Sequence, residues 1–296
     1  MTWLLNVLGA LLAAVALRDI FHTVWYPRGY GSLAHALCRW VWRLTRFWNR
    51  RTGKSTELGG PLGLLVTVTV WTLLIVLGFA LIYLPHLPDG FSYSSSVDVA
   101  GSTGFSAAAY VSLTYVSTLG LGDIAPSYDA LQVIVPVQAL TGFILLTSAI
   151  SWVLQVYPTL SRRRSVALQL KLLGTESTYR TMREGLPEIA SRMLDSVTQA
   201  VVECSTDLSV YAESYFFRER ERDRSLPAQI PVAVRMGREA EKSASPEVRR
   251  SAEMLQAAIE NLAETLNRDF LHVEGGPEAV LEEFAADHQQ PSALPT

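Results

Sequence analysis

Long uncharged stretches alternate with basic and polar segments along the first 164 residues of the chain. Residues 61–84 and 131–160 contain no Asp, Glu, Lys or Arg. A helix over 61–84 would extend about 36 Å at 1.5 Å per residue, more than the roughly 30 Å hydrocarbon core of a bilayer. The pattern therefore predicts a transmembrane helix over each of the two stretches.

A third span is predicted over residues 3–26, where Arg18, Asp19 and His22 interrupt the apolar pattern near its end. The alternative is a cleaved signal peptide, because Ala-Val-Ala at 14–16 resembles a small-residue cleavage site, although no basic region precedes it. Arg18, Asp19 and His22 would lie near one interface, where an arginine can snorkel and an aspartate can pair with it. We favour this structural role over a proton relay or a voltage sensor.

Beyond residue 165 the apolar positions follow the spacing of soluble helices. A helix is predicted over 186–217, and a linker around Pro227 and Pro231. A second helix is predicted to begin after Ser245, with apolar residues at heptad spacing. This seam packs either on the chain's own helices, which we favour, or on other copies of the chain. Its members are Val248, Ala252, Leu255, Ile259, Leu262 and Leu266.

Composition and charge agree with this division. The 296 residues are 49% hydrophobic and 18% charged, whereas an ordinary soluble domain has about 25% charged residues. Residues 1–164 contain 11 Lys and Arg against 6 Asp and Glu, and the remainder contains 14 against 22. We therefore expect a membrane-embedded part followed by an acidic, water-exposed part. Cys38 and Cys204 are too few for a disulfide framework and are expected to be packing residues.

Basic segments flank the predicted spans and indicate their orientation. The segment from Arg28 to Lys54 has seven basic residues and no acid, and three arginines at 162–164 directly follow the last span. By the positive-inside rule both are cytoplasmic, so residues 85–129 lie outside. Within the first segment, four arginines share one helical face, which predicts an interfacial amphipathic helix or a plain basic connector. The four are Arg39, Arg43, Arg46 and Arg50.

A short apolar stretch at 105–117 would make only about 20 Å of helix, too little to span a bilayer. It runs directly into Thr-Leu-Gly-Leu-Gly-Asp at 118–123. A short helix followed by extended backbone predicts a re-entrant loop, which is tolerated only where protein surrounds it or it lines a watery cavity. Gly120 and Gly122 permit dihedral angles that let successive carbonyl groups point toward one axis, where they can replace the water shell of a potassium ion.

This stretch resembles the filter of the potassium channel pore family, which reads Thr-Val-Gly-Tyr-Gly-Asp. The outer helix, pore helix, filter and inner helix follow the family's order over 61–160. The resemblance implies K⁺ binding by backbone carbonyls and the Thr118 hydroxyl, an acidic outer mouth at Asp123, and a homotetramer, because each chain supplies one loop of four. It also makes Gly142 a candidate gating hinge, with close helix packing as the alternative. The filter residues are Thr118, Leu119, Gly120, Leu121 and Gly122.

Three positions depart from the family pattern. Leu121 replaces the usual tyrosine, so the phenolic hydroxyl that ties the filter to the pore helix is absent. Ser117 replaces a common threonine, and Tyr115 lies where another threonine is usual. Two alternative functions follow from these departures and from the helical C-terminal part: a weakly selective cation channel, and a non-conducting membrane scaffold with a partner-binding domain.

Together these patterns predict an all-α membrane protein with three transmembrane helices, a re-entrant pore helix with its selectivity filter, and a cytoplasmic helical domain. We expect a passive potassium-selective channel of the plasma membrane, with the bilayer and copies of itself as partners, K⁺ as permeant ion, no cofactor, no nucleic acid and no enzymatic activity. The expected divisions are an N-terminal transmembrane helix at 1–27, a basic cytoplasmic linker at 28–60, a pore domain at 61–160, the cytoplasmic helical domain at 161–274 and a flexible tail at 275–296.

Overall fold

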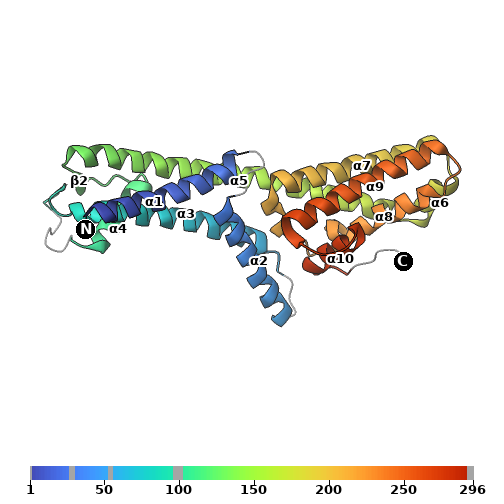
Figure 1. Ribbon diagram of the computed structural model, residues 1–296, viewed down its shortest axis with the longest axis horizontal. Helices are drawn as coiled ribbons and strands as arrows, with labels where there is room; N and C mark the ends of the chain where they lie inside the picture. The colour runs from blue at the N-terminus through green and yellow to red at the C-terminus, as the bar shows by residue number, and fades with distance from the viewer. Residues whose placement is uncertain (1, 27–30, 53–55, 96–102, 292–296) are drawn as a thin grey trace. The chain divides into compact units, whose positions relative to one another are not determined.

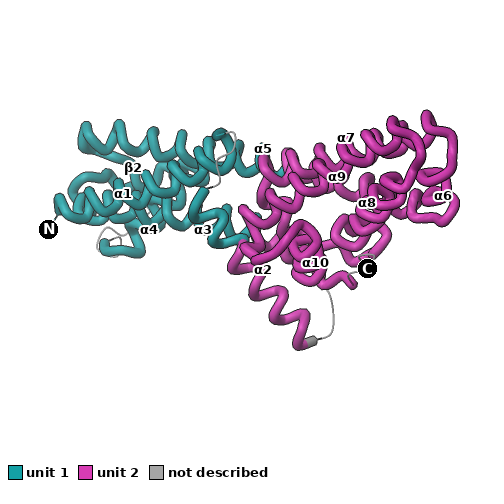
Figure 2. The backbone as a smooth tube through the Cα atoms, turned by 45° about the vertical axis from the view of Figure 1, so that its right-hand side comes forward, with its two compact units in different colours: residues 1–38, 64–154 teal, residues 39–63, 155–296 magenta. Residues whose placement is uncertain are grey.

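The computed structural model describes residues 2–26, 31–52, 56–95 and 103–291. Arg28 and Lys54 of the basic segment and residues 292–296 of the predicted tail lie outside this part. The chain forms two compact units (Figure 2). Unit 1 comprises residues 1–38 and 64–154, and unit 2 comprises residues 39–63 and 155–296. The unit boundaries fall within helices α2, α3 and α5, whose bounds are given below.

Among the described residues, three helices are long and apolar enough to cross a membrane, which confirms the predicted all-α membrane fold (Figure 1). They are α1 (Thr2–Ile20) with its π-helical continuation η1 (Phe21–Trp25), α3 (Gly59–Tyr83) with the 3-10 turn η2 (Leu84–His86), and α5 (Asp129–Leu173). The shorter apolar helix α4 (Phe105–Val116) matches the predicted pore helix in position. The strands β1 (Phe91–Tyr93) and β2 (Ile124–Pro126) pair antiparallel.

Helix α5 is longer than the span predicted at 131–160, because no helix-breaking residue follows until Gly174. Its basic turn is also stabilised within unit 2. The guanidinium group of Arg163 donates hydrogen bonds to the backbone carbonyl oxygens of Ser214, at 2.7 Å, and Phe217, at 2.6 Å. The charged residues that end the apolar run therefore do not end the helix.

The first helix packs against the outer helix through two glycines. A Cβ atom on Gly9 would overlap the carbonyl oxygen of Gly78, and one on Gly78 would lie 2.7 Å from the carbonyl oxygen of Gly9. Small residues at a crossing let two apolar helices approach closely and gain van der Waals contact, which is a main source of helix association in lipid. Helix α1 is therefore part of the membrane bundle of unit 1.

Asp19 caps the N-terminus of α2 (Ser32–Thr52). One carboxylate oxygen accepts a hydrogen bond from the backbone N–H of Leu33 at 2.9 Å, and the other accepts from the N–H of Ala34 at 3.0 Å and the indole of Trp71 at 2.8 Å. The first N–H groups of a helix lack intrahelical partners, and the helix dipole favours a negative charge beside them. The structural role holds, but the expected pairing of Asp19 with Arg18 was wrong.

Unit 2 is a helical bundle in which α7 and α9 lie side by side (Figure 1). All six residues of the heptad seam are at least 93% buried within the single chain, so the seam packs on the chain's own helices. The elements of unit 2 that follow α5 are α6 (Glu176–Glu184), α7 (Pro187–Val210), η3 (Ala212–Phe216), η4 (Arg222–Arg224), α8 (Leu226–Glu241), α9 (Pro246–Leu266), η5 (Asn267–Leu271) and α10 (Pro277–Asp287).

Two predictions for unit 2 were wrong. The stretch around Pro227 and Pro231 is not a linker but the first turns of α8, where Pro227 occupies a position that needs no N–H donor. The predicted flexible tail contains α10, whose Leu281 and Phe284 are buried in the bundle. In both segments the burial of apolar side chains outweighs the local signals of Pro, Gly and charge.

Candidate functional site

A buried polar network holds α4 between α3 and α5. The hydroxyl of Ser112 donates a hydrogen bond to the carbonyl oxygen of Val76 at 2.8 Å, and the amide of Gln138 donates to the carbonyl oxygen of Ser112 at 2.9 Å. The hydroxyl of Tyr83 completes the network by donating to the Gln138 side chain at 2.6 Å. Buried polar groups are costly unless they are hydrogen-bonded, so these bonds define the position of α4 along both neighbouring helices.

Helix α5 crosses the C-terminal end of α4 at Gly142. This glycine is buried, and a Cβ atom on it would overlap the backbone carbonyl oxygen of Val116, the last residue of α4. The contact supports the alternative of close packing that the sequence left open. The hinge role of Gly142 stays a prediction.

The six residues after α4, Ser117–Gly122, form an extended loop that we call the 117–122 loop. The backbone φ angle is positive at Thr118 (60°), Gly120 (53°) and Gly122 (74°), and negative at Leu119 and Leu121. In a regular strand, residues of uniform φ sign turn successive carbonyl groups to opposite sides. Alternation of the φ sign reverses every second peptide plane, which brings successive carbonyl groups to the same side of the chain.

Thr118 has a conformation that its side chain does not favour. A β-branched residue with positive φ is unusual, and the left-handed region costs an ordinary residue about 1–2 kcal/mol. The conformation is held by the end of α4, where the N–H of Thr118 donates to the carbonyl oxygen of Tyr115 at 3.0 Å, and the N–H of Leu119 donates to that of Thr114 at 3.1 Å. Backbone strain kept in this way is typical of functional segments.

Within the described part of the chain, no other residues cover the 117–122 loop. All six of its residues are exposed, and a Cβ atom on Gly120 or Gly122 would meet no atom within 4 Å. Leu119 and Leu121 have 66% and 61% of their surface exposed. Because non-helical backbone in a membrane must be surrounded by protein or water, this loop requires water or protein beyond the described residues around it.

Two tyrosine side chains of α4 form hydrogen bonds with the segment that follows the loop. The hydroxyl of Tyr110 donates to the Asp123 carboxylate at 2.6 Å, and the hydroxyl of Tyr115 donates to the carbonyl oxygen of Ile124 at 2.8 Å. In the sequence Tyr115 stands out only as a departure from the family pattern, and no local pattern indicates this hydrogen bond. Leu121 has no hydroxyl group with which to bond the loop to α4. A hydrogen bond between α4 and this segment is instead made by Tyr115.

Other chemistry is not indicated in the described part of the chain. It contains no group of three or more His, Cys, Asp and Glu side chains that could hold a metal ion. Cys38 and Cys204 are buried. Burial raises the pKa of the Cys204 thiol to about 12, which keeps it protonated and unreactive at neutral pH.

Comparison with known proteins points to the same region. Residues 67–157 match a family model described as "Ion channel". The chain is 27% identical over 173 residues to the uncharacterized membrane protein YdjJ of Bacillus subtilis (strain 168), in an alignment that covers 58% of this chain and 50% of that protein. The chain thus spans about half the length of this curated relative. No solved structure matches it. The residues matched by the family model include α4 and the 117–122 loop, and the match supports a channel-family pore domain in this region.

Proposed function

We propose that this protein is a passive, potassium-selective channel in which four copies of the chain surround one axis. The 117–122 loop is the filter: backbone carbonyl oxygens from Thr118 to Leu121 and the Thr118 hydroxyl coordinate K⁺, and Asp123 lies at the outer mouth. The alternating φ sign at Thr118, Gly120 and Gly122 carries the proposal, because it favours carbonyl oxygens on one side of the loop. A row of such oxygens can replace the hydration shell of potassium without a charged side chain.

The exposed loop also favours the tetramer. One loop offers carbonyl oxygens from a single side, whereas an ion needs ligands around its whole circumference. Four loops related by rotation about one axis supply them, and such closed symmetry is common in homo-oligomers. Neighbouring chains would also cover Leu119 and Leu121, which are 66% and 61% exposed in the single chain.

Helix α4 contributes electrostatically to the same pathway. The C-terminal end of a helix carries about half a unit of negative charge. In α4 this end leads directly into Thr118. Four such ends directed at one axis would stabilise a cation there before it enters the filter. The basic segments that flank the spans favour a cytoplasmic unit 2 in this proposed plasma-membrane channel.

The test is the reversal potential of the purified protein in a planar bilayer with K⁺ on one side and Na⁺ on the other. The wild type is expected to reverse close to the potassium equilibrium potential. Gly120→Ala and Gly122→Ala are expected to abolish the potassium current while the protein still inserts, because alanine at positive φ is strained. Gly276→Ala is the matched control, since a Cβ there also meets nothing within 4 Å but φ is −78°.

The other outcomes decide between the alternatives. Current that reverses near zero would contradict selectivity and favour a weakly selective cation pore. A robust potassium current in Gly120→Ala would contradict the assignment of the filter. Absence of current from wild-type protein whose mass in detergent is that of a tetramer would favour a non-conducting scaffold.

A further inference from the structure

Unit 2 contains a cavity of about 360 Å³ with one strongly basic wall. The wall belongs to α2, where Arg39, Arg43 and Arg46 line the cavity. Residues spaced by three or four positions lie on the same face of a helix, so the three guanidinium groups share one side of α2. Arg50, one turn further along the same helix, does not line the cavity.

The opposite rim carries His272 in a rigid turn. His272 follows η5 and has a φ angle of 58°, which a non-glycine residue rarely adopts. The side chain of Asn267 holds this turn: its oxygen accepts from the N–H of Val273 at 2.6 Å, and its amide donates to the carbonyl oxygen of Val273 at 3.0 Å. These hydrogen bonds fix the backbone at His272, whose exposed side chain lines the cavity.

Aromatic side chains and one buried carboxylate form the inner part of the cavity. Phe270 stacks on Tyr215 with ring centroids 4.2 Å apart. Asp287 accepts hydrogen bonds from the indole of Trp42 at 2.9 Å and the hydroxyl of Tyr215 at 2.7 Å, and it forms an ion pair with Arg46. Asp287 is therefore already compensated and does not neutralise Arg43.

The remaining charges leave the cavity positive. Three arginines face two carboxylates, Asp287 and Glu283, so one positive charge is in excess before His272 is counted. Arg43 is exposed and makes no ion pair or hydrogen bond with any residue in the described part of the chain. A guanidinium group offers paired N–H donors that match phosphate oxygens, which makes a phosphoryl group the best complement to this wall.

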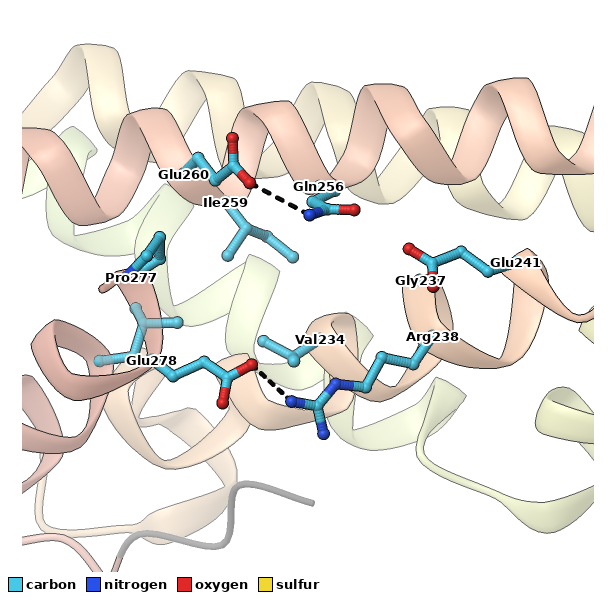
Figure 3. Close-up of a pocket in the computed structure, with 10 residues that line it drawn as sticks. Val234, Gly237, Arg238, Glu241, Gln256, Ile259, Glu260, Pro277 and Glu278 are labelled. Atoms are coloured by element: carbon cyan, nitrogen blue, oxygen red, sulfur yellow. Dashed lines mark hydrogen bonds and ion pairs between the residues drawn. The ribbon is translucent and has the colours of Figure 1, made fainter. Parts of the chain in front are cut away.

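A second cavity in unit 2 shows the opposite arrangement. It measures about 280 Å³ and lies between α8, α9 and α10 (Figure 3). Its one arginine is paired: Arg238 forms an ion pair with Glu278 at 2.5 Å, and the neutral amide of Gln256 donates to Glu260 at 3.1 Å (Figure 3). Glu241 adds a further acid. The positive excess and the uncommitted guanidinium group distinguish the cavity beside α2.

We propose that the cavity lined by Arg39, Arg43, Arg46 and His272 binds a phosphate-bearing ligand. Its volume is in the range of small-molecule sites, about 300–1,000 Å³. The phosphoryl group lies against the arginines and His272, and any apolar part of the ligand lies toward Phe270. Both a soluble phosphorylated molecule and the headgroup of an anionic lipid have this chemistry.

The experiment is isothermal titration calorimetry of the purified full chain in detergent at constant ionic strength. The probes are inorganic pyrophosphate for the soluble source, and dioctanoyl phosphatidylglycerol for the lipid source with dioctanoyl phosphatidylcholine as its net-neutral counterpart. Arg43→Gln is expected to weaken binding at least tenfold, and His272→Asn, which keeps a residue that tolerates positive φ, several-fold. Arg50→Gln is the matched control and should leave affinity unchanged.

Each result decides the proposal. Pyrophosphate or phosphatidylglycerol binding that depends on Arg43 and not on Arg50 supports the site, and the probe that binds identifies the source. Equal loss in Arg43→Gln and Arg50→Gln would show a merely solvated basic face and overturn it, as would the absence of binding by both probes. The titration measures binding directly, so it does not depend on whether the pore conducts potassium.

Discussion

The hydroxyl group of Tyr115 donates a hydrogen bond to the backbone carbonyl oxygen of Ile124 at 2.8 Å. The bond joins the last turn of α4 to the first residue of β2. Its two partners are nine positions apart in sequence, and the whole 117–122 loop lies between them. The two ends of the loop are thereby held at a set separation. In the proposed channel this separation sets the length over which the carbonyl oxygens can be distributed.

Tyr115→Phe removes this bond and keeps the ring. The loss of a hydrogen bond of this kind is worth about 0.5–1.5 kcal/mol, enough to loosen the loop without unfolding α4. We expect the bi-ionic reversal potential to shift toward zero as K⁺ and Na⁺ are discriminated less well. Tyr128→Phe is the matched control, because Tyr128 is exposed and its hydroxyl has no partner in the described structure. An unchanged reversal potential in Tyr115→Phe would show that the bond does not support selectivity.

Gly142→Ala places a methyl group against the carbonyl oxygen of Val116. Overpacking of this kind costs about 1–3 kcal/mol and here also displaces the end of α4. We expect a lower melting temperature in detergent and a smaller tetramer fraction. Gly237→Ala, in the buried part of α8, is the contrasting variant. Its Cβ would have its nearest neighbour, on Leu255, at 3.9 Å, so it should be neutral or stabilising. Equal melting temperatures for the two variants would refute the packing role of Gly142.

Asp19→Asn turns an acceptor of three hydrogen bonds into a group with one acceptor and one donor. The new amide would face either the N–H of Leu33 or the two donors on Ala34 and Trp71, leaving a donor without its acceptor at a cost of about 1–3 kcal/mol. We expect weaker protection of the first turn of α2 against hydrogen exchange and a lower melting temperature. Arg18→Gln is the neighbouring control and should change neither quantity. If both variants behaved alike, the cap would not be a significant interaction.

His288 should make the stability of the protein depend on pH. Burial, followed by the positive charges of Arg163, Arg218 and Arg46, lowers the pKa of His288 well below its ordinary value of 6.5. The unfolded chain therefore binds a proton that the folded chain excludes. This contribution to stability is complete above about pH 6.5 and declines as the pH falls below it, by up to about 1.4 kcal/mol per pH unit.

The measurement is the thermal unfolding of the full chain in detergent, followed by circular dichroism between about pH 7 and pH 5. His288→Phe should reduce the fall in melting temperature, because phenylalanine fills a similar volume and the Nε2 atom of His288 has no hydrogen-bond partner in the described structure. His272→Gln, an exposed histidine, should retain the wild-type pH dependence. An identical slope in wild type and His288→Phe would contradict the assignment.

The membrane helices and α4 could be predicted from sequence because lipid requires long apolar runs. Burial of α10 could not, since Leu281 and Phe284 are buried by packing against α8 and α9, which the local sequence of α10 does not indicate. The same holds for α8, where a proline in the sixth position reads locally as a break. Tertiary packing overrides local propensity in both.

Within the candidate site, the unusual backbone at Gly120 and Gly122 followed from the residue type alone, whereas that at Thr118 did not. A threonine with positive φ is enforced by the carbonyl groups at the end of α4, which no local pattern reveals. The hydrogen bonds of Tyr115 and Tyr110 likewise join positions that are 9 and 13 residues apart across a loop. Such pairs become visible only when the direction of the chain after Gly122 is known.

The contact between Gly142 and Val116 couples the position of α5 to the start of the 117–122 loop. Any swing of α5 at this level either pushes on the last carbonyl group of α4 or releases it, and the next residues in the chain are Ser117 and Thr118. A displacement of the inner helix is thus transmitted mechanically to the strained threonine within two residues. In the proposed channel, movement of α5 and adjustment of the ion-binding oxygens would be one coupled motion.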